Sequence, residues 1–210
     1  MGYKSSGGEM VWNEELEKEI PISWNVKPFT QATALGGGGT PSTKNDKYWN
    51  GEIPFFTPAD VSKSYYTIKT EKALTEKGLE NCSSKLYPKN TVFVTARGTV
   101  GAIALAGVPM AMNQSCYAIQ GTQVNQFFSH QLTIHTIKRL KNEALGAVFN
   151  ALVTKDFDGQ HVVVPNGDTV KLFEKQIQPT YNYLLINSKQ AEFLRELLSI
   201  LLARMTIIEG

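Results

Sequence analysis

The sequence predicts an α+β protein in which a mixed α/β domain is followed by a long C-terminal helix of coiled-coil type. Two observations predict this division. Short β-branched or aromatic runs alternate with glycine-rich segments up to residue 165, and an apolar heptad pattern then continues to residue 205. We expect an N-terminal arm or linker over residues 1–23, the mixed domain over 24–168 and the helix over 169–210.

Within the domain, Thr91–Thr95 and His161–Val164 have the length and composition of strands. Residues 125–145 place apolar side chains near helical spacing, which predicts a helix. The connections between these elements are long, and long loops in a compact domain usually serve a function. The segment before Trp24 is polar and acidic and ends at Pro21, which favours an exposed arm.

The C-terminal helix is predicted from Val170 to Met205, interrupted by Pro179. With Ile177 at an a position, the apolar heptad positions of a helix interface are Ile177, Leu184, Ala191, Leu194, Leu198, Leu201 and Met205. A two-stranded seam cannot bury its apolar stripe alone, so we expect a partner helix, for which a second copy of the chain is one candidate. The alternative is a helix that packs on its own domain.

Composition argues against several classes of protein. Cys82 and Cys116 lack the spacing and the nearby histidines of a zinc site, so buried, reduced thiols are expected. No apolar run approaches the roughly 18 residues that span a bilayer, and the N-terminus lacks a signal-peptide core. These features predict a cytoplasmic protein.

The formal net charge of +2 is unevenly distributed along the chain. Residues 1–23 carry two Lys and five Glu, whereas residues 24–165 carry fourteen Lys or Arg against nine Asp or Glu. Residues 166–210 are balanced. The basic bias of the domain is compatible with a polyanionic partner, although an ordinary solvated surface would also explain it.

The chain lacks the residues of the enzymes that act on nucleic acid. It contains no Glu-x-Lys triplet of a metal-dependent nuclease and no Asn/Asp-Pro-Pro-Tyr run of a base methyltransferase. The Gly36–Gly39 run is followed by Thr40-Pro41 instead of the Gly-Lys-Ser/Thr of a phosphate-binding loop, so a backbone turn against Tyr48-Trp49 is expected. We predict no catalytic residue, no metal ligand and no cofactor.

Side chains suited to DNA are more plentiful than catalytic ones. They gather in three segments: Lys63–Tyr66 with Lys69, Arg97-Gly98-Thr99, and Asn113-Gln114-Ser115. Cations and hydroxyls anchor phosphates, whereas Asn, Gln and Arg can contact adenine or guanine edges in pairs of hydrogen bonds. Each segment also has a plain structural explanation, a solvated loop or a core tyrosine pair.

Several motifs, in order, resemble the specificity subunits of type I restriction–modification systems. They are Tyr3–Val11, Ile20-Pro21-x-x-Trp24, Gly38–Ser42, Tyr48-Trp49-x-Gly51-x-Ile53-Pro54, Arg97–Gly101, Met112–Gln114, Thr154–Phe157, Val163–Pro165 and Leu194-Arg195-x-Leu197-Leu198. Such subunits usually carry two target recognition domains, each of which reads one half of a bipartite DNA sequence, separated by two antiparallel helices. With one domain and one helix, this chain resembles half of that plan, either a half-subunit that dimerises or the second half of a longer subunit.

The resemblance implies a non-enzymatic protein that binds double-stranded DNA, methyltransferase subunits and, through the complex, a motor-nuclease subunit. It implies base readout by Lys63, Tyr65, Tyr66, Asn113 and Gln114, and phosphate contacts by Lys44, Lys47, Lys69, Arg97 and Lys155, with Thr99 beside them. Two alternatives stay open: an assembly adaptor that binds methyltransferase subunits through its helix without reading DNA, and a fragment of a DNA-modifying enzyme.

Overall fold

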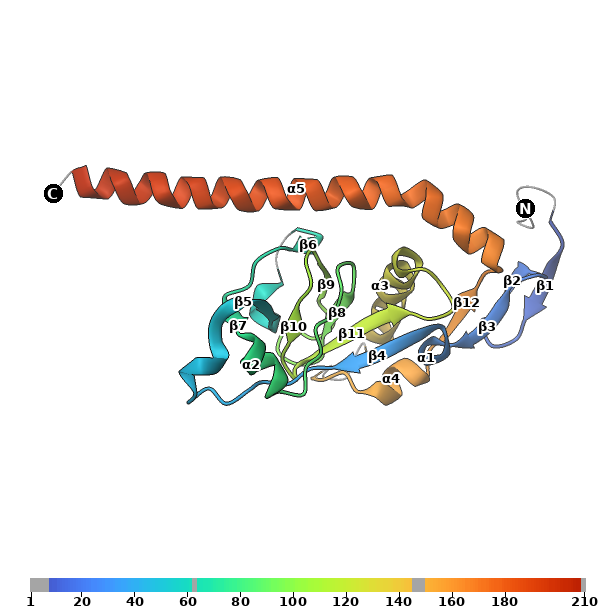
Figure 1. Ribbon diagram of the computed structural model, residues 1–210. Coiled ribbons are helices and arrows are strands. Elements are labelled where there is room, and N and C mark those ends of the chain that lie inside the picture. The colour runs from blue at the N-terminus through green and yellow to red at the C-terminus, as the bar shows by residue number, and fades with distance from the viewer. Residues whose placement is uncertain (1–7, 62–63, 145–149, 209–210) are drawn as a thin grey trace.

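A five-stranded sheet forms the centre of the domain (Figure 1). The computed structural model describes residues 8–61, 64–144 and 150–208. The strand order is β4 (Thr33–Gly37), β11 (Cys116–Gly121), β8 (Val92–Thr95), β9 (Ile103–Ala106) and β6 (Tyr66–Thr67). Neighbours are antiparallel except β9 and β6, which run parallel. Every residue of β8 is buried, as expected of an apolar strand covered on both faces, and the predicted strand at this position is confirmed.

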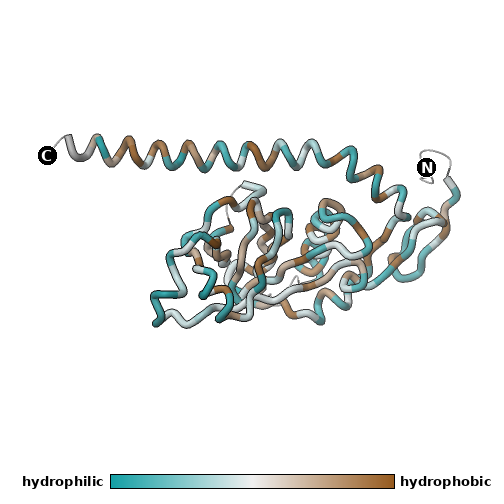
Figure 2. Tube along the Cα trace, in the orientation of Figure 1, coloured by the Kyte–Doolittle hydropathy of each residue, from teal (hydrophilic) through white to brown (hydrophobic). Residues whose placement is uncertain are grey.

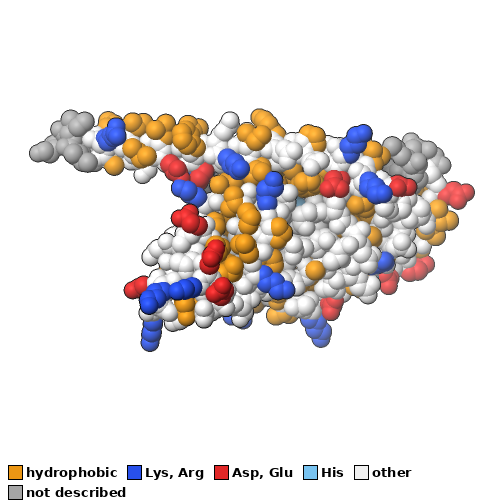
Figure 3. All heavy atoms as spheres, viewed as in Figure 1, with side chains coloured by type: hydrophobic (Ala, Val, Ile, Leu, Met, Phe, Trp, Pro, Cys, Tyr) orange, Lys and Arg blue, Asp and Glu red, His pale blue; other side chains and the backbone are white. Residues whose placement is uncertain are grey.

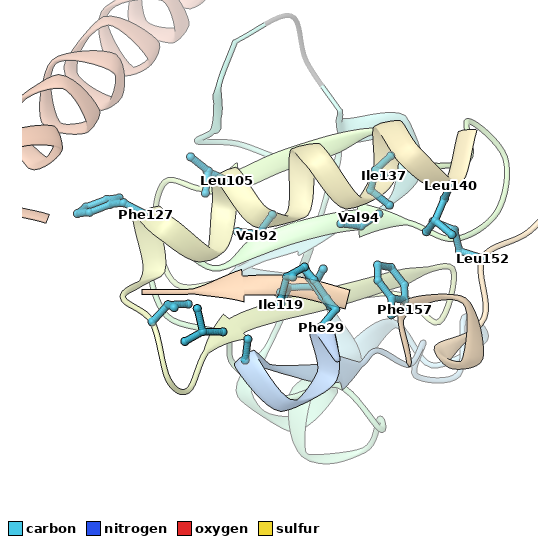
Figure 4. Close-up of a cluster of buried hydrophobic side chains, with 14 of the residues drawn as sticks. Phe29, Val92, Val94, Leu105, Ile119, Phe127, Ile137, Leu140, Leu152 and Phe157 are labelled. Carbon is cyan, nitrogen blue, oxygen red and sulfur yellow. The ribbon is translucent and has the colours of Figure 1, made fainter. Parts of the chain in front are cut away.

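Helix α3 (Gln126–Glu143) covers one face of the sheet and closes the main hydrophobic core (Figure 4). The helix begins at Asn125, whose side chain accepts a hydrogen bond from the backbone N–H of Phe128 at 2.8 Å. Val92 and Val94 on β8 meet Ile137 and Leu140 of α3 in this core. The helix predicted in this part of the sequence is confirmed.

The other face of the sheet packs on a smaller three-stranded sheet. Its order is β10 (Ala111–Met112), β5 (Trp49–Phe56) and β7 (Lys72–Leu74), with η2 (Asp46–Tyr48), η3 (Pro58–Asp60) and α2 (Glu76–Glu80) alongside. Phe93 points to this side of β8, and its ring centroid lies 4.7 Å from that of Phe56. Trp49 Nε1 donates to Ser42 O at 3.1 Å, so the tryptophan is bonded to the turn that the sequence places beside it.

The remaining short elements lie at the start of the chain and directly before the C-terminal helix. They are β1 (Met10–Asn13), β2 (Lys18–Pro21), β3 (Asn25–Pro28), α1 (Phe29–Ala32), α4 (Thr154–Asp158) and β12 (His161–Val164). Strand β12 pairs with β3, as a strand was predicted there. The exposed arm expected over residues 1–23 holds instead, in its described part, an antiparallel β1–β2 hairpin that buries Ile20 and Pro21.

Helix α5 (Gly167–Ile208) runs along one side of the domain and projects beyond it (Figure 1). Asn166 caps its first turn by accepting the backbone N–H of Thr169 at 2.9 Å. The helix bends in its first part, and we attribute the bend to Pro179, which lies inside α5.

The first half of α5 packs on the domain through Tyr181. The Tyr181 hydroxyl lies 2.7 Å from His130 Nδ1 and accepts a hydrogen bond from Gln131 Nε2 at 2.9 Å. The Tyr181 hydroxyl thus joins α5 to two side chains of α3. The Tyr181 ring also packs on Phe127, with centroids 4.4 Å apart. Asn125 Nδ2 adds a hydrogen bond to Val170 O at 2.9 Å.

The interface positions predicted on α5 fall into two groups. Ile177 and Leu184 pack against the main core of the domain, and Ala191 is half-buried. Leu194, Leu198, Leu201 and Met205 are 49–61% exposed. The first part of the predicted seam is therefore used by the protein's own domain.

Beyond Ser188, the apolar stripe of α5 lies on the side that faces away from the domain. Leu185 is buried against the domain, and Leu201 lies about 160° further around the helix at 3.6 residues per turn. Apolar residues recur along the projecting half in Figure 2, and Figure 3 shows hydrophobic side chains along its outer side. Exposed apolar residues of this half include Phe193, Leu194, Leu197, Leu198, Ile200, Leu201, Leu202 and Met205.

We predict that His130 makes the stability of the protein depend on pH. Burial lowers the pKa of His130 to about 4. As the pH falls from about 6.5 to about 4, the unfolded chain binds a proton that the folded protein does not, so the free energy of unfolding falls by about 3 kcal/mol. His130→Asn keeps an acceptor for Tyr181 and should remove this component in denaturant unfolding at pH 7 and pH 4.5. His135→Asn, at an exposed position of the same helix, is the control, and an unchanged pH dependence in His130→Asn would contradict the assignment.

Candidate nucleic-acid interface

Four strands of the central sheet meet at one edge. Strands β4 and β8 end there, and β9 and β11 begin there, because Gly37 pairs with Tyr117, Thr95 with Cys116, and Val94 with Ile103. The loops at this edge are residues 38–40, 96–102 and 113–115, which we call the loop edge.

The opposite ends of these strands approach α5. Gly107, which follows β9, lies so close to the helix that a Cβ there would be 3.4 Å from Leu185 Cδ1. Asn125, which follows β11, bonds to Val170 in the first turns of α5. The loop edge therefore lies at the strand ends that are remote from the helix.

The 113–115 loop is held by backbone contacts and presents Gln114. Asn113 N donates to Phe56 O at 3.0 Å, and Asn113 Oδ1 accepts from Ser115 N at 3.0 Å. Gln114 is exposed, and its Oε1 accepts a hydrogen bond from Thr40 Oγ1 at 2.6 Å. This bond orients the amide and leaves its NH₂ group as a donor toward a ligand. Half-buried Asn113 is chiefly a support of the loop.

A close approach of two backbones joins this loop to the glycine-rich turn. A Cβ on Gly38 would lie 2.1 Å from Asn113 O and 2.4 Å from Met112 O, so only glycine fits without a backbone shift. Gly39 N donates to Met112 O at 3.0 Å. The sequence predicted a backbone turn for Gly36–Gly39, whereas Gly36 and Gly37 belong to strand β4 and pair with β11. It also did not identify the contact with the 113–115 loop or the role of Thr40, for which the hydroxyl directly after the glycines was the available signal.

The 96–102 loop presents Arg97 and Thr99, both of which are exposed. Thr95 Oγ1 donates to Thr99 O, and Gly101 N donates to Thr95 O at 2.8 Å. Gly98 and Gly101 have φ of +76° and +71°, which favour glycine at both positions. The loop is thus a rigid support for a guanidinium and a hydroxyl.

Lys155 is exposed on α4, near the start of β11. Tyr117 OH lies 3.4 Å from Thr154 Oγ1, and Leu152 N donates to Ala96 O at 2.9 Å. Lys155 is therefore placed on the segment that lines the loop edge beside Arg97.

Other predicted contacts lie away from the loop edge. Lys44 and Lys47 are exposed near η2, at the far end of the smaller sheet, and Lys63 lies outside the described residues. Tyr65 is 57% exposed. Lys69 forms an ion pair with Glu196 of α5, and this hydrogen bond raises the pKa of the Lys69 ammonium. The structure thus assigns Lys69 a partner within the protein.

Tyr66 corrects one prediction. Its side chain is 2% exposed in the main core, and its hydroxyl donates to Asn90 Oδ1 at 2.9 Å. Burial raises the pKa of this phenol above its usual value. Neighbouring residues of an extended strand point to opposite faces, so Tyr65 is directed to solvent and Tyr66 to the core, where it is unavailable for base contacts.

The described residues contain no group of three or more His, Cys, Asp or Glu side chains that could hold a metal ion. Within the same ranges, no helix has the length and hydropathy to cross a membrane. Among the described residues, the loop edge is a set of hydrogen-bond donors with a cation, which can bind a polyanion and contact base edges.

Comparison with known proteins identifies the family of the chain. Residues 21–178 match the type I restriction modification DNA specificity domain. The specificity subunit of the type I restriction enzyme MjaIX from Methanocaldococcus jannaschii is 37% identical over 109 residues, which are 49% of this chain and 25% of that protein. The HindI specificity subunit from Haemophilus influenzae is 26% identical over 191 residues, 89% of this chain and 41% of that protein.

Two solved structures share the fold. The HsdS subunit from Thermoanaerobacter tengcongensis superposes with a TM-score of 0.54 at 16% identity, covering 80% of this chain and 40% of that one. A chain from a structure of type I R-M complex assembly gives 0.56 at 18% identity, covering 85% and 44%. The chain therefore spans less than half the length of these relatives. The predicted fold class and resemblance are confirmed: the chain belongs to the family of type I restriction–modification DNA specificity domains.

Proposed function

We propose that the loop edge reads one half of a bipartite DNA target and thereby directs methyltransferase and restriction subunits to it. The observation that carries this proposal is the convergence of Arg97 and Thr99 from one loop with Gln114 from another at one end of the sheet, on backbones fixed by hydrogen bonds. Arg97 and Lys155 supply phosphate contacts, and Gln114 supplies base contacts through its amide.

The proposed partners are double-stranded DNA, methyltransferase subunits and, through the complex, a motor-nuclease subunit. Solved structures of this fold include a chain from a type I R-M complex, which supports the assembly. The proposed seat of the partner is the projecting half of α5, because its apolar side chains face away from the domain. A second helix, from another copy or from the rest of a longer subunit, would cover part of this surface. S-adenosylmethionine and ATP chemistry would belong to the partners, and the proposed location of the assembly is the cytoplasm.

The same exposed half of α5 favours one alternative, an assembly adaptor that binds methyltransferase subunits without reading DNA. Co-expression with a methyltransferase subunit, followed by sequencing of methylated positions in host DNA, separates the two. A methylated bipartite motif is expected, and a palindromic one would show pairing of two copies. A stable complex with no methylated motif would contradict the reading of DNA and support the adaptor.

Arg97→Ala and Gln114→Ala are expected to differ in kind. Arg97→Ala should weaken binding to all duplexes by about tenfold and lower the salt slope by about 0.9, because one phosphate contact is lost. Gln114→Ala should change the preferred bases at one position by about 1–3 kcal/mol and leave the salt slope unchanged. Fluorescence anisotropy at several salt concentrations and selection from random duplexes measure both, with Lys189→Ala on α5 as control. Identical behaviour of all three variants would rule out this assignment.

Gly38→Ala is expected to disrupt the loop edge, because its Cβ would overlap two backbone carbonyl oxygens. We expect the DNA affinity to fall by about tenfold or more and the melting temperature to decrease. Gly37→Ala is the matched control, since a Cβ there meets nothing within 4 Å. Wild-type affinity and melting temperature in Gly38→Ala would show that the two loops are not joined as described.

Leu198→Asp is expected to abolish binding of a methyltransferase subunit or a second copy, because it places a charge in the exposed apolar stripe of α5. Burial of an unpaired carboxylate costs several kcal/mol by order of magnitude, roughly a hundredfold in affinity or more. Ser199→Asp lies on a different side of the same turn and is the control. Size-exclusion chromatography with light scattering measures the complexes, and equal binding by both variants would contradict the role of this stripe.

A further inference from the structure

A groove separates α3 from the β1–β2 hairpin and from strand β12. It encloses about 420 Å³ and is remote in sequence from the loop-edge residues. The residues that line it are Leu16, Lys18, Phe128, Leu132, His135, Thr136, Lys138, Arg139, Asn142, His161, Val162 and Val163. We call it the α3 groove.

The α3 groove follows one face of the helix. Phe128, Leu132, Thr136, Arg139 and Asn142 recur at spacings of three or four residues, which places them along one side. From residue 128 to residue 142 this side is about 21 Å long at 1.5 Å per residue, enough for a segment of about six extended residues.

The floor and rim of the groove differ in chemistry. Phe128, Leu132 and Val162 give an apolar floor. The residues that line the groove include Lys18, Lys138 and Arg139 and no carboxylate within the described ranges. An occupant that complements this surface carries apolar side chains together with negative charges.

Contacts within the protein prepare the groove for such an occupant. Arg139 Nη2 donates to His161 O at 2.8 Å, which holds the guanidinium beside β12. At the hairpin side, Glu15 Oε2 lies 3.6 Å from His161 Nε2, so this carboxylate has a partner within the protein. Lys138 is exposed on α3.

Strand β12 adds a backbone surface. Among the described strands, β12 pairs with β3 in a two-stranded sheet, so its other edge has no strand partner within these ranges. His161 O, which Arg139 reaches from α3, belongs to that edge. An open strand edge beside apolar pockets is the arrangement that binds extended peptides by strand addition.

We propose that the α3 groove binds an extended protein segment in which apolar residues alternate with Asp or Glu. The apolar side chains lie on the floor between α3 and β12, the backbone pairs with the open edge of β12, and the carboxylates meet Lys18, Lys138 and Arg139. The apolar floor favours a protein segment over duplex DNA, because apolar side chains of a peptide are stabilised by burial on it, whereas phosphate contacts use only the cations. This binding is independent of the loop edge.

Three synthetic peptides test the proposal by titration of the ¹⁵N-labelled chain, followed by NMR: Glu-Leu-Glu-Val-Glu-Leu, the same peptide with Lys for Glu, and the same peptide with Ser for Leu and Val. The Glu/Leu peptide should shift resonances of α3, β12 and residues 14–18 with a Kd below about 1 mM, and both controls should bind at least about tenfold more weakly. Lys138→Glu should reverse the preference between the Glu and Lys peptides, whereas Lys189→Glu should not.

Equal binding of the three peptides, or shifts confined to other elements, would overturn the proposal. Shifts of the same α3 resonances by a duplex oligonucleotide, in place of the Glu/Leu peptide, would make the groove a nucleic-acid surface and overturn it as well. Lys138→Glu should leave DNA affinity unchanged, and Arg97→Ala should leave peptide binding unchanged. The absence of peptide binding to the groove is therefore distinguishable from the absence of DNA recognition by the loop edge.

Discussion

The hydroxyl group of Tyr181 is the contact on which the relation between domain and helix depends. It accepts a hydrogen bond from Gln131 and forms a second one with His130, so one buried oxygen satisfies two side chains of α3. Removing any member would leave a buried polar group unpaired, which costs about 1–3 kcal/mol. Because α3 also forms one wall of the main core, the direction of α5 is set by the same helix that holds the central sheet. The direction of the projecting half of α5 is thus set by the contacts that the first half of the helix makes with α3.

The central sheet links this anchor to the loop edge. Strands β9 and β11 approach α5 at one end and carry the loops at the other. Regular strands are stiff, so their two ends keep a fixed separation, and the loops add their own restraints at Gly38, Thr95 and Gln114. A recognition surface built on such supports loses little conformational entropy when it binds. The geometry therefore suits a protein that must hold DNA and a partner in a defined relation.

Local sequence patterns predicted the secondary-structure elements but not the contacts between residues that are distant in sequence. The strand β8, the helix α3 and the helix α5 followed from composition and periodicity, because each buries a stripe that its own residues define. The hairpin over residues 10–21 was missed because its exposed, charged residues resemble an arm, and its pairing partners define it instead. Lys69 was grouped with DNA contacts because its partner Glu196 lies 127 positions away. Tyr66 was misplaced since a Tyr pair alone does not say which member faces the core. Gln114 was identified as a candidate, but its bond to Thr40 depends on the close approach at Gly38, which local sequence does not indicate.

The apolar side of α5 changes along the helix, and this change supports a helical partner more strongly than the heptad pattern alone. Tyr181 and Leu185 are buried against the domain, whereas the exposed residues Leu194, Leu198, Leu201 and Met205 lie roughly half a turn around the helix from Leu185. One straight helix cannot bury both stripes against the same body. Moreover, Ile200, Leu201 and Leu202 are adjacent in sequence and all about half exposed, so the apolar surface is wider than the narrow stripe of a two-stranded coiled coil. Fully burying one such side chain contributes about 1.5–3 kcal/mol. A single partner helix would leave part of this surface in water, so the projecting half of α5 is suited to contact with more than one helix.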